Sequence, residues 1–396
     1  MTEGFDAEIG VLGAGPAGAR AATILAAEGA HVLVWDGRAP WEKPCGGGLA
    51  ASAFEHVPEL REVHPRARRI DAVRFQVAPG RGFSVPLARP MHMISREELG
   101  RWQLDRLEAA GACRVRATVR SLRREKEGWS VESREGREWR VRLLVGSDGA
   151  ASLVRRVAAP GFRVELAPTR VSYPTGTGDT PDTILVRLYH EVEGYFWDFA
   201  RPDHRSVGVG TEPGSWSRAR MDREIDGYAA EVVGSDVSRS TARRGAVIGT
   251  ARLGHGDFSA VGGRDFALLG DAAGFADPAT GEGIQNALRS GGLLADAYRE
   301  GGDFSSYPER ARTAFGAEFR AGRLLRRVLF GAGVGPWLVQ RGERSSWARS
   351  LVSAVMNCTN EHDLTVAGLL RRSLTGGGAG TARTAPGNPS SQAPGP

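Results

Sequence analysis

Three glycine-bearing segments lie far apart in the chain, and each follows an apolar run and leads into a helical pattern. They cover residues 13–18, 146–149 and 270–284. A glycine-rich turn between a strand and a helix brings the backbone close to a phosphate at the helix N-terminus. Because the carboxyl ends of parallel strands share one edge of a sheet, we expect the three segments to meet there. The pattern predicts one flavin site in an FAD-dependent oxidoreductase of the α/β class.

The first segment has an expected strand on each side of its helix. Residues 7–12 form the first strand, Pro16 suits a first helical turn, and Gly29 sits at the C-terminal cap. The second strand ends at Asp36, whose carboxylate can accept hydrogen bonds from a ribose. The FAD contacts predicted here are Gly13, Gly15, Ala17, Gly18 and Asp36.

These segments resemble those of the p-hydroxybenzoate-hydroxylase-type flavoproteins. Within that superfamily, the Lys-Pro-Cys-Gly-Gly-Gly-Leu loop at 43–49, the segment 194–200 and the Gly-Glu-Gly sequence at 281–283 are similar to the geranylgeranyl reductase family. The resemblance covers most of residues 5–300. It implies FAD as the cofactor and a polyprenyl substrate whose carbon–carbon double bonds are reduced.

Matched positions imply further FAD contacts. Arg96 falls where the superfamily has an arginine that reaches the cofactor, and a guanidinium suits a pyrophosphate. Val119, at the end of a strand that starts at Arg114, is placed to offer backbone groups to the adenine. Asp271 matches the carboxylate that holds the ribityl hydroxyls, and a helix beginning near Gly283 would stabilise negative charge on the reduced flavin. The remaining predicted cofactor contacts are Cys45, Gly46, Gly48, Asp148 and Ile284.

The loop at 43–49 also supplies the main catalytic candidate, Cys45. The glycines that follow it let the loop lie against the flavin ring, where side chains would collide. A thiol is largely protonated at neutral pH and can donate. Cys45 is therefore interpreted either as the donor or relay of a proton to the alkene, or as a small residue that shapes the cavity.

A predicted hairpin over 194–211 carries the other catalytic candidates. Its alternation places Tyr195, Trp197 and Phe199 on one face. In the resembled family this segment lines the substrate cavity, and aromatic faces would stabilise a cation-like carbon next to the protonated one. Tyr195 and Trp197 are assigned to catalysis, with an ordinary apolar sheet face as the alternative. Arg201 is interpreted as a contact for an anionic headgroup.

Composition limits the class of protein. The chain has 396 residues, of which 41% are hydrophobic and 25% charged, enough for one large or two joined domains. The acidic N-terminus argues against a secretory signal. Cys45, Cys113 and Cys358 have neither metal-ligand spacing nor a paired framework, so we expect no metal and a reducing cytoplasm. The net charge is +6, but carboxylates interrupt the arginine-rich stretches, so we expect no nucleic-acid partner.

Contact with a membrane is left open by one apolar run. No segment has the roughly 18 to 20 consecutive apolar residues that a membrane span requires. The run at 328–339 is flanked by Arg326, Arg327 and Arg341. Core packing is favoured for it, and an interfacial element whose arginines meet lipid phosphates is the alternative. The expected location is the cytoplasm, with peripheral membrane association left open.

The expected fold is a Rossmann-like FAD-binding domain with an inserted β-rich substrate domain and a C-terminal helical segment. The composition of the last residues has too few apolar groups to fold. The predicted parts are the FAD-binding domain at 1–157, with 60–91 as a partly separate insertion, its return at 262–300, the substrate domain at 160–255, helices at 303–373 and a disordered tail at 375–396.

The predicted function is saturation of double bonds in a polyprenyl (geranylgeranyl-type) substrate by hydride transfer from reduced FAD. Gly274, the Asp-Pro pair at 277–278 and the sequence at 281–283 follow the reductase version of the third segment, where aromatic hydroxylases usually have His, Pro-Pro and Gly-Gln-Gly. The alternatives are a flavin-dependent aromatic monooxygenase and a non-catalytic flavin electron carrier or lipid-binding module. With no second strand-bounded dinucleotide fingerprint, the electron donor is either NADPH or a ferredoxin.

Overall fold

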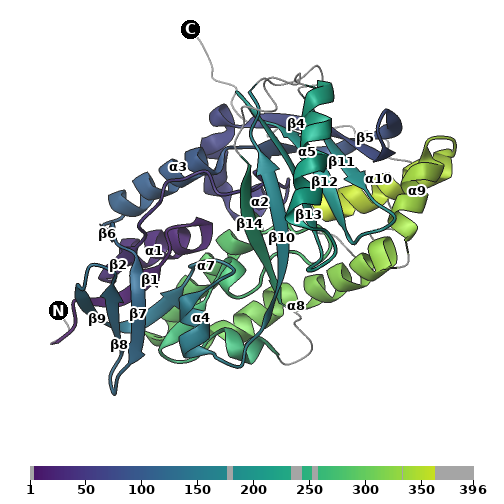
Figure 1. The fold of residues 1–396 in the computed structure, drawn as a ribbon. Coiled ribbons are helices and arrows are strands. Elements are labelled where there is room, and N and C mark those ends of the chain that lie inside the picture. The colour runs from purple at the N-terminus through teal and green to yellow at the C-terminus, as the bar shows by residue number, and fades with distance from the viewer. Residues whose placement is uncertain (1–3, 176–181, 233–242, 252–256, 332, 362–396) are drawn as a thin grey trace, which may run out of the picture.

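The computed structural model describes residues 4–175, 182–232, 243–251, 257–331 and 333–361. Two sheets lie at opposite ends of the molecule, and C-terminal helices run from one to the other (Figure 1). The predicted α/β fold, with a Rossmann-like sheet, a β-rich sheet and C-terminal helices, is confirmed. The tail predicted to be disordered, at 375–396, lies outside the described residues.

Sheet A has seven strands in the order β6-β2-β1-β9-β8-β7, with β15 paired to β9. The pairs β6–β2, β2–β1, β1–β9 and β9–β15 are parallel, so the carboxyl ends of these strands meet at one edge. The remaining strands, β8 and β7, continue the sheet as an antiparallel pair. The strands are β1 (Ala7–Leu12), β2 (Val32–Trp35), β6 (Cys113–Val115), β7 (Val119–Arg124), β8 (Trp129–Ser133), β9 (Glu138–Gly146) and β15 (Phe266–Leu268).

Helices from distant parts of the chain pack beside sheet A. The first begins at Pro16, where a fixed φ suits the first turn, and ends before Gly29, which has a φ of +92°. It crosses the helix after the third glycine segment so closely that a Cβ on Gly291 would lie 2.7 Å from the carbonyl oxygen of Ala17. These helices are α1 (Pro16–Ala27), α3 (Arg96–Ala109), α4 (Leu153–Ala158) and α7 (Ile284–Gly301).

Sheet B has eight strands in the order β14-β10-β13-β12-β11-β4-β5-β3. Its β4 and β5 come from residues 68–93, and β4 pairs in parallel with β11, so the sheet joins two separate stretches of the chain. One face of β12 and β13 is covered by α5 (Arg218–Val232), which packs Ile225 against Phe196 and Val209. The strands are β3 (Gly48–Leu49), β4 (Arg68–Ala78), β5 (Arg81–Met93), β10 (Val164–Ser172), β11 (Thr183–Leu188), β12 (Gly194–Ala200), β13 (Arg205–Thr211) and β14 (Arg244–Ala251).

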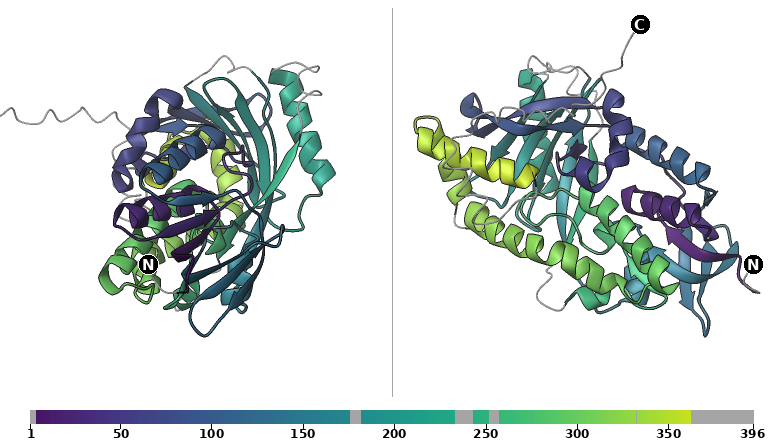
Figure 2. Two further views of the ribbon diagram at one scale, coloured as in Figure 1. Left: turned by 90° about the vertical axis from the view of Figure 1, so that its left-hand side faces the viewer. Right: turned by 180° about the vertical axis from the view of Figure 1, so that it is seen from behind.

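The C-terminal helices connect the two sheets. In Figure 2, α8 leaves the side of sheet A and leads to α9 and α10 beside sheet B. Leu338 of α9 and Val352 of α10 join an apolar cluster with Val73 and Phe83 of sheet B. These elements are α8 (Tyr307–Arg326), the π-helical η4 (Arg327–Gly331), α9 (Val334–Gly342) and α10 (Ser346–Asn360). The short elements are α2 (Ala53–His56), η1 (Pro58–Arg66), η2 (Asp257–Val261) and η3 (Gly270–Ala272).

The apolar run at 328–339 is divided between η4 and α9. Leu338 and Val339 are buried, whereas Val328 and Trp337 are 43% and 49% exposed. The run therefore contributes to the core and to the surface at once. Among the described residues, no helix combines the length and the apolar character that crossing a bilayer would require.

Candidate functional site

A cavity of about 970 Å³ lies between sheet A, sheet B and the C-terminal helices. The three glycine segments line one part of it, and apolar side chains from sheet B and from α8 to α10 line another. The sequence-predicted residues that line this cavity are Gly13, Gly15, Ala17, Asp36, Cys45, Gly46, Gly48, Arg96, Val119, Asp148, Tyr195, Trp197, Asp271, Gly283 and Ile284.

The β1–α1 turn needs its glycines for two different reasons. Gly13 has a φ of +95°, and a Cβ there would lie 2.5 Å from the carbonyl oxygen of Ser147. A Cβ on Gly18, which does not line the cavity, would lie 2.1 Å from the carbonyl oxygen of Gly13. A Cβ on Gly15 would meet no protein atom within 4 Å. Gly13 and Gly18 therefore allow close packing within the protein, whereas Gly15 faces the open cavity at the N-terminus of α1.

Asp36 is fixed at the end of β2 by backbone amides. Its Oδ2 accepts a hydrogen bond from Ala14 N at 2.9 Å, and its Oδ1 accepts from Arg38 N at 2.8 Å and Ala39 N at 2.9 Å. Each carboxylate oxygen has two lone-pair directions, so Oδ1 is fully engaged and Oδ2 can accept one further hydrogen bond. The carboxylate is thus held rigidly beside the glycine turn.

Asp148, from the second segment, is engaged within the protein. Its Oδ1 accepts from Ser152 Oγ at 2.6 Å, and its Oδ2 accepts from the amides of Leu153 at 2.5 Å and Val154 at 3.3 Å. Burial raises the pKa of Asp148 above its usual value, although these hydrogen bonds oppose the rise. Asp148 therefore organises the start of α4, and it also lines the cavity.

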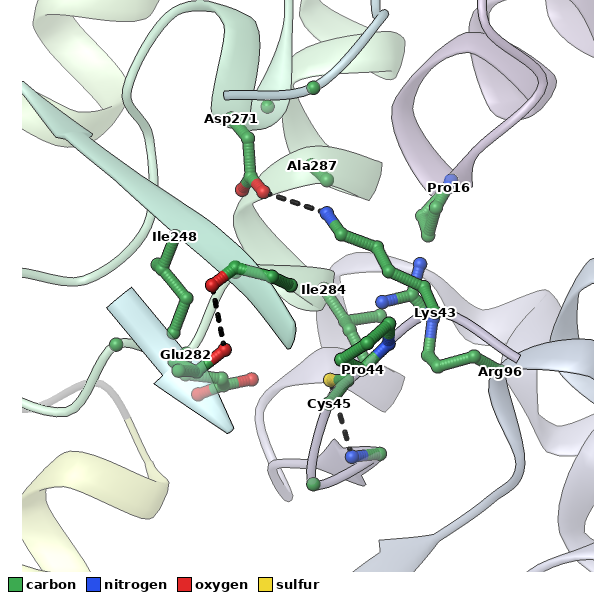
Figure 3. Close-up of a pocket in the computed structure, with 18 of the residues that line it drawn as sticks. Pro16, Lys43, Pro44, Cys45, Arg96, Ile248, Asp271, Glu282, Ile284 and Ala287 are labelled. Atoms are coloured by element: carbon green, nitrogen blue, oxygen red, sulfur yellow. Dashed lines mark hydrogen bonds and ion pairs between the residues drawn. The ribbon is translucent and has the colours of Figure 1, made fainter. Parts of the chain in front are cut away.

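Asp271, from the third segment, forms an ion pair across the cavity. Its Oδ2 lies 2.9 Å from Lys43 Nζ, and Figure 3 shows the lysine reaching from its loop toward this carboxylate. A Cβ on Gly283 would lie 3.2 Å from Asp271 Oδ1, so this glycine lets the carboxylate approach the first turn of α7. Gly283 caps α7 without a side-chain hydrogen bond, which leaves first-turn amides available. The helix start predicted near Gly283 is confirmed.

Arg96 of α3 and Val119 of β7 also line the cavity. Arg96 is the first residue of α3, whose N-cap is Ser95: its Oγ accepts from Glu97 N and Glu98 N. The buried Arg96 Nε has no hydrogen-bond partner among the described residues (Figure 3). Val119 begins β7; the prediction that it ends a strand starting at Arg114 is wrong, because β6 ends at Val115 and a separate strand starts at Val119.

The loop that carries Cys45 is tied to sheet B by Arg201. Arg201 Nη2 donates to Cys45 O at 2.7 Å and its Nε to Gly46 O at 3.4 Å, while Ser206 Oγ donates to the same Cys45 oxygen at 2.9 Å. The interpretation of Arg201 as a headgroup contact is wrong, because its side chain is fully buried and does not line the cavity. Cys45 Sγ accepts from Gly47 N at 3.3 Å (Figure 3).

Glu42 completes this support. Its Oε1 lies 2.7 Å from Arg201 Nη1, and its Oε2 accepts from Ser95 Oγ at 2.7 Å and Glu97 N at 3.2 Å. Burial acts to raise the pKa of Glu42, but the Arg201 charge and these hydrogen bonds outweigh it and leave the pKa below its usual value. An ionised carboxylate therefore links the Cys45 loop, the turn between β12 and β13, and the start of α3.

Three aromatic rings form one wall of the cavity. Tyr195, Trp197 and Phe199 of β12 all line it, so the predicted shared face is confirmed. The Tyr195 hydroxyl donates to Thr280 O, and burial raises the pKa of Tyr195 well above its usual value. Trp197 Nε1 donates to Ser206 Oγ at 3.1 Å. Because the polar atoms of Tyr195 and Trp197 are engaged within the protein, the wall is mainly apolar.

Comparisons with known proteins agree with this geometry. No family model matches the chain. A geranylgeranyl diphosphate reductase of Rhodobacter capsulatus is 29% identical over 72% of this chain and 73% of its own length. A digeranylgeranylglycerophospholipid reductase of Methanopyrus kandleri is 27% identical over 79% of this chain and 87% of its own. The chain is a homologue of the geranylgeranyl reductases.

A solved structure supports the fold of this geranylgeranyl reductase homologue. It is a geranylgeranyl bacteriochlorophyll reductase-like protein of Thermoplasma acidophilum, with a TM-score of 0.71, 17% identity, and coverage of 92% of this chain and 95% of that one. The relatives named above are reductases, and the protein is an enzyme of the FAD-dependent oxidoreductase class.

The cavity of this homologue fits the anionic dinucleotide that its class uses. Gly15 faces open space at the positive end of α1, and the buried Arg96 Nε still has a proton to donate. The start of α7 offers further free amides beside Asp271. Donors for phosphates and acceptors for hydroxyls thus lie along one side of the cavity.

Sequence reasoning missed two parts of the site. Lys43 was not chosen, although it stands two residues before Cys45, and only the fold brings it to Asp271. The apolar wall from the C-terminal helices was also missed; the spacing of apolar residues in 325–356 was its only signal. The main side chains of this wall are Leu325, Leu329, Phe330, Leu338, Val339, Val352 and Met356.

Proposed function

We propose that the protein saturates carbon–carbon double bonds of a polyprenyl, geranylgeranyl-type substrate with reduced FAD. The observation that carries the proposal is the continuity of one cavity from the glycine segments to an apolar chamber between sheet B and α8 to α10. A long hydrocarbon chain matches such a chamber, because apolar groups gain free energy when removed from water.

Residues around the glycine segments would hold the cofactor. We assign the ribose to Asp36, the pyrophosphate to the N-terminus of α1 and Arg96, and the ribityl hydroxyls to Asp271. The start of α7 would place its positive dipole end beside the flavin. Reduced FAD, when bound, supplies the hydride. The protein excludes bulk water through the aromatic and aliphatic walls.

Cys45 is the proposed donor or relay of the proton that the alkene takes up. Its loop is held in place by Arg201 and Ser206, so the thiol is positioned rather than mobile. The faces of Tyr195 and Trp197 would stabilise the positive charge that develops on the neighbouring carbon. The alternative for Cys45 is a packing role, with the proton supplied by water.

The names of the relatives support an isoprenoid substrate but not one particular headgroup. The polyprenyl chain of the substrate is proposed to be carried on a diphosphate, a glycerol phosphate, a quinone or a chlorophyll precursor. Electrons are proposed to arrive from NADPH or a ferredoxin. Because such substrates reside in bilayers, we propose a cytoplasmic enzyme with peripheral membrane contact.

An aromatic monooxygenase is the second candidate, since solved structures of similar fold include a probable FAD-dependent monooxygenase of Pseudomonas aeruginosa. The observation that favours the reductase is the third segment, where Gly274, Asp277 and Glu282 stand in place of the residues usual in hydroxylases. A flavin electron carrier or lipid-binding module would bind FAD and lipid but convert neither. Oxygen uptake would identify the monooxygenase.

The test begins with the purified protein, which should be yellow and release free FAD on acid precipitation. The protein is then reduced chemically without oxygen and incubated with prenyl diphosphates, prenyl glycerol phosphates and prenyl quinones. Mass spectrometry should detect products that have gained two hydrogens per reduced double bond. A colourless protein that also fails to bind added FAD would refute the proposal. FAD reduction without any saturated product would favour the carrier.

A further inference from the structure

Large apolar side chains are concentrated on the outside of the C-terminal helices. Leu324 is 63% exposed, Val328 43%, Trp337 49% and Trp347 62%. The other large apolar side chains counted as exposed among the described residues are Val157 and Leu166, at 38% each, and they lie on other elements. Isolated exposed apolar residues are common, but a group of this kind usually marks an interaction site. We refer to Leu324, Val328, Trp337 and Trp347 as the outer apolar group.

These side chains stand on helices whose opposite face lines the cavity. Leu324 and Val328 are four positions apart and share one side of the helix, whereas the adjacent Leu325 and Leu329 line the cavity. Trp337 is exposed on α9, and the next residue, Leu338, is buried at the cavity wall. The apolar chamber is therefore separated from the outer apolar group by one layer of helix.

Unpaired charge around the outer apolar group is positive, because Arg326 pairs with Glu165 and Glu193. Arg327, Arg341, Arg344 and Arg349 are exposed, and none of them forms an ion pair with a described residue. The single carboxylate between residues 320 and 360 is Glu343, which is paired with Arg81. The carboxylates of Glu343, Glu165 and Glu193 are thus each paired with another arginine, and the four exposed arginines keep their positive charge beside the tryptophans.

We propose that this surface docks on the face of an anionic lipid bilayer. Tryptophan is favoured at the membrane interface, where an apolar ring meets polar headgroups, and arginines bind lipid phosphates. The four unpaired arginines favour an anionic bilayer over other apolar partners, because its headgroups complement positive charge over the whole surface. Docking here would bring the helices that line the apolar chamber next to the lipid that holds the substrate. This functional role of docking rests on the proposed function.

The test uses the FAD-loaded protein and vesicles without prenyl substrate. Vesicles of phosphatidylcholine alone are compared with vesicles that also contain phosphatidylglycerol, and bound protein is measured by co-sedimentation. We expect binding to the anionic vesicles, weakened by salt, and much less binding to phosphatidylcholine. The Arg341→Gln/Arg344→Gln variant should lose roughly fivefold in partitioning for each arginine. The Trp337→Gln/Trp347→Gln variant should lose about tenfold or more.

Matched controls use the same substitutions elsewhere on the surface. Val157→Gln/Leu166→Gln removes exposed apolar groups, and Arg123→Gln/Arg137→Gln removes exposed charge. Both should bind vesicles like the unmodified protein, and all variants should keep their FAD and thermal midpoint. Absence of binding to anionic vesicles, or equal binding by the tryptophan variant, overturns the proposal.

A concentration-dependent dimer that the tryptophan variant abolishes would also overturn the proposal, because it would assign the outer apolar group to a second copy of the chain. Failure here is distinct from failure of the proposed reductase activity. That activity is measured with detergent-dispersed substrate and needs no vesicle.

Discussion

Replacing Arg201 with glutamine should destabilise the protein and loosen the Cys45 loop. The side chain of Arg201 is fully buried, and its guanidinium joins Glu42 to two carbonyl oxygens of the loop. Glutamine is too short to make these contacts together and carries no charge. The variant leaves Glu42 ionised and largely buried without its cation.

The size of the effect follows from what Glu42 retains. Removing one partner of a buried ion pair typically costs about 3–5 kcal/mol. Glu42 keeps the hydrogen bonds from Ser95 Oγ at 2.7 Å and Glu97 N at 3.2 Å, which favours the lower end. We expect the free energy of unfolding to fall by about 3 kcal/mol at neutral pH, roughly 150-fold in the folding equilibrium.

The loss should depend on pH in a defined direction. In the unmodified protein the pKa of Glu42 is below its usual value, so its stabilisation is present above the unfolded-state pKa and is lost as pH falls. Without Arg201, burial is opposed only by the remaining hydrogen bonds, and the pKa of Glu42 should rise above its usual value. The variant then loses stability as pH rises through that raised pKa. The gap between the two proteins should therefore be larger at about pH 7.5 than at about pH 5.

Urea and thermal unfolding, followed by circular dichroism at both pH values, measure the gap. The double variant Glu42→Gln/Arg201→Gln removes both charges and should be more stable than Arg201→Gln alone, with a coupling of about 1 kcal/mol or more. Arg201→Lys keeps the charge and loses the forked contacts to the loop, which separates the two contributions. An Arg201→Gln variant as stable as the unmodified protein at neutral pH would refute the reasoning, as would a double variant with no gain over the single one.

Three further outcomes are expected. Asp271→Ala should weaken FAD binding by roughly 10- to 150-fold in a fluorescence titration, since a charged hydrogen-bond acceptor contributes about 1.5–3 kcal/mol, and unchanged affinity would show that the ribityl contact lies elsewhere. Cys45→Ser should keep FAD while single-turnover alkene reduction falls about 100- to 10,000-fold, and an unchanged rate would make Cys45 a packing residue. Burial and the stacked His64 lower the pKa of His92 to about 4, so stability is lost as pH falls toward that value. His92→Gln should therefore show a smaller drop in thermal midpoint between about pH 7.5 and pH 5, and an equal drop would contradict the assignment.

The local sequence pattern was sufficient to predict individual strands and helices and the residues that share a face. The strand over Ala7–Leu12, the helix begun by Pro16 and the shared face of Tyr195 and Trp197 were predictable, because periodicity and terminal residues decide them. Val119 was assigned to the wrong end of a strand, since strand ends depend on the partner strand, and the sequence does not show which strand that is.

Contacts between residues far apart in the sequence could not be predicted from the local sequence pattern. An arginine beside a proline and an aspartate suggests an exposed turn, yet Arg201 is buried because Glu42 and the carbonyl of Cys45 meet it there. The pair formed by Lys43 and Asp271 joins residues 228 positions apart. In both cases the two partners come from separate parts of the chain, so neither residue alone carries the signal.

The sequence order of the strands and helices also determines when each part of the cavity can form during synthesis. Sheet A receives β15 only after residue 268, and the cavity receives its α7 wall only after residue 284. Asn357 of α10 then donates to Pro86 O at 3.3 Å, and Asn360 donates to Arg89 O at 2.8 Å. A ribosome-bound chain that ends before α7 lacks a complete cofactor cavity, and one that ends before α10 leaves the apolar chamber open to solvent. Flavin binding is therefore expected to follow release of the chain, and the unfinished chain exposes apolar surface that the finished fold buries.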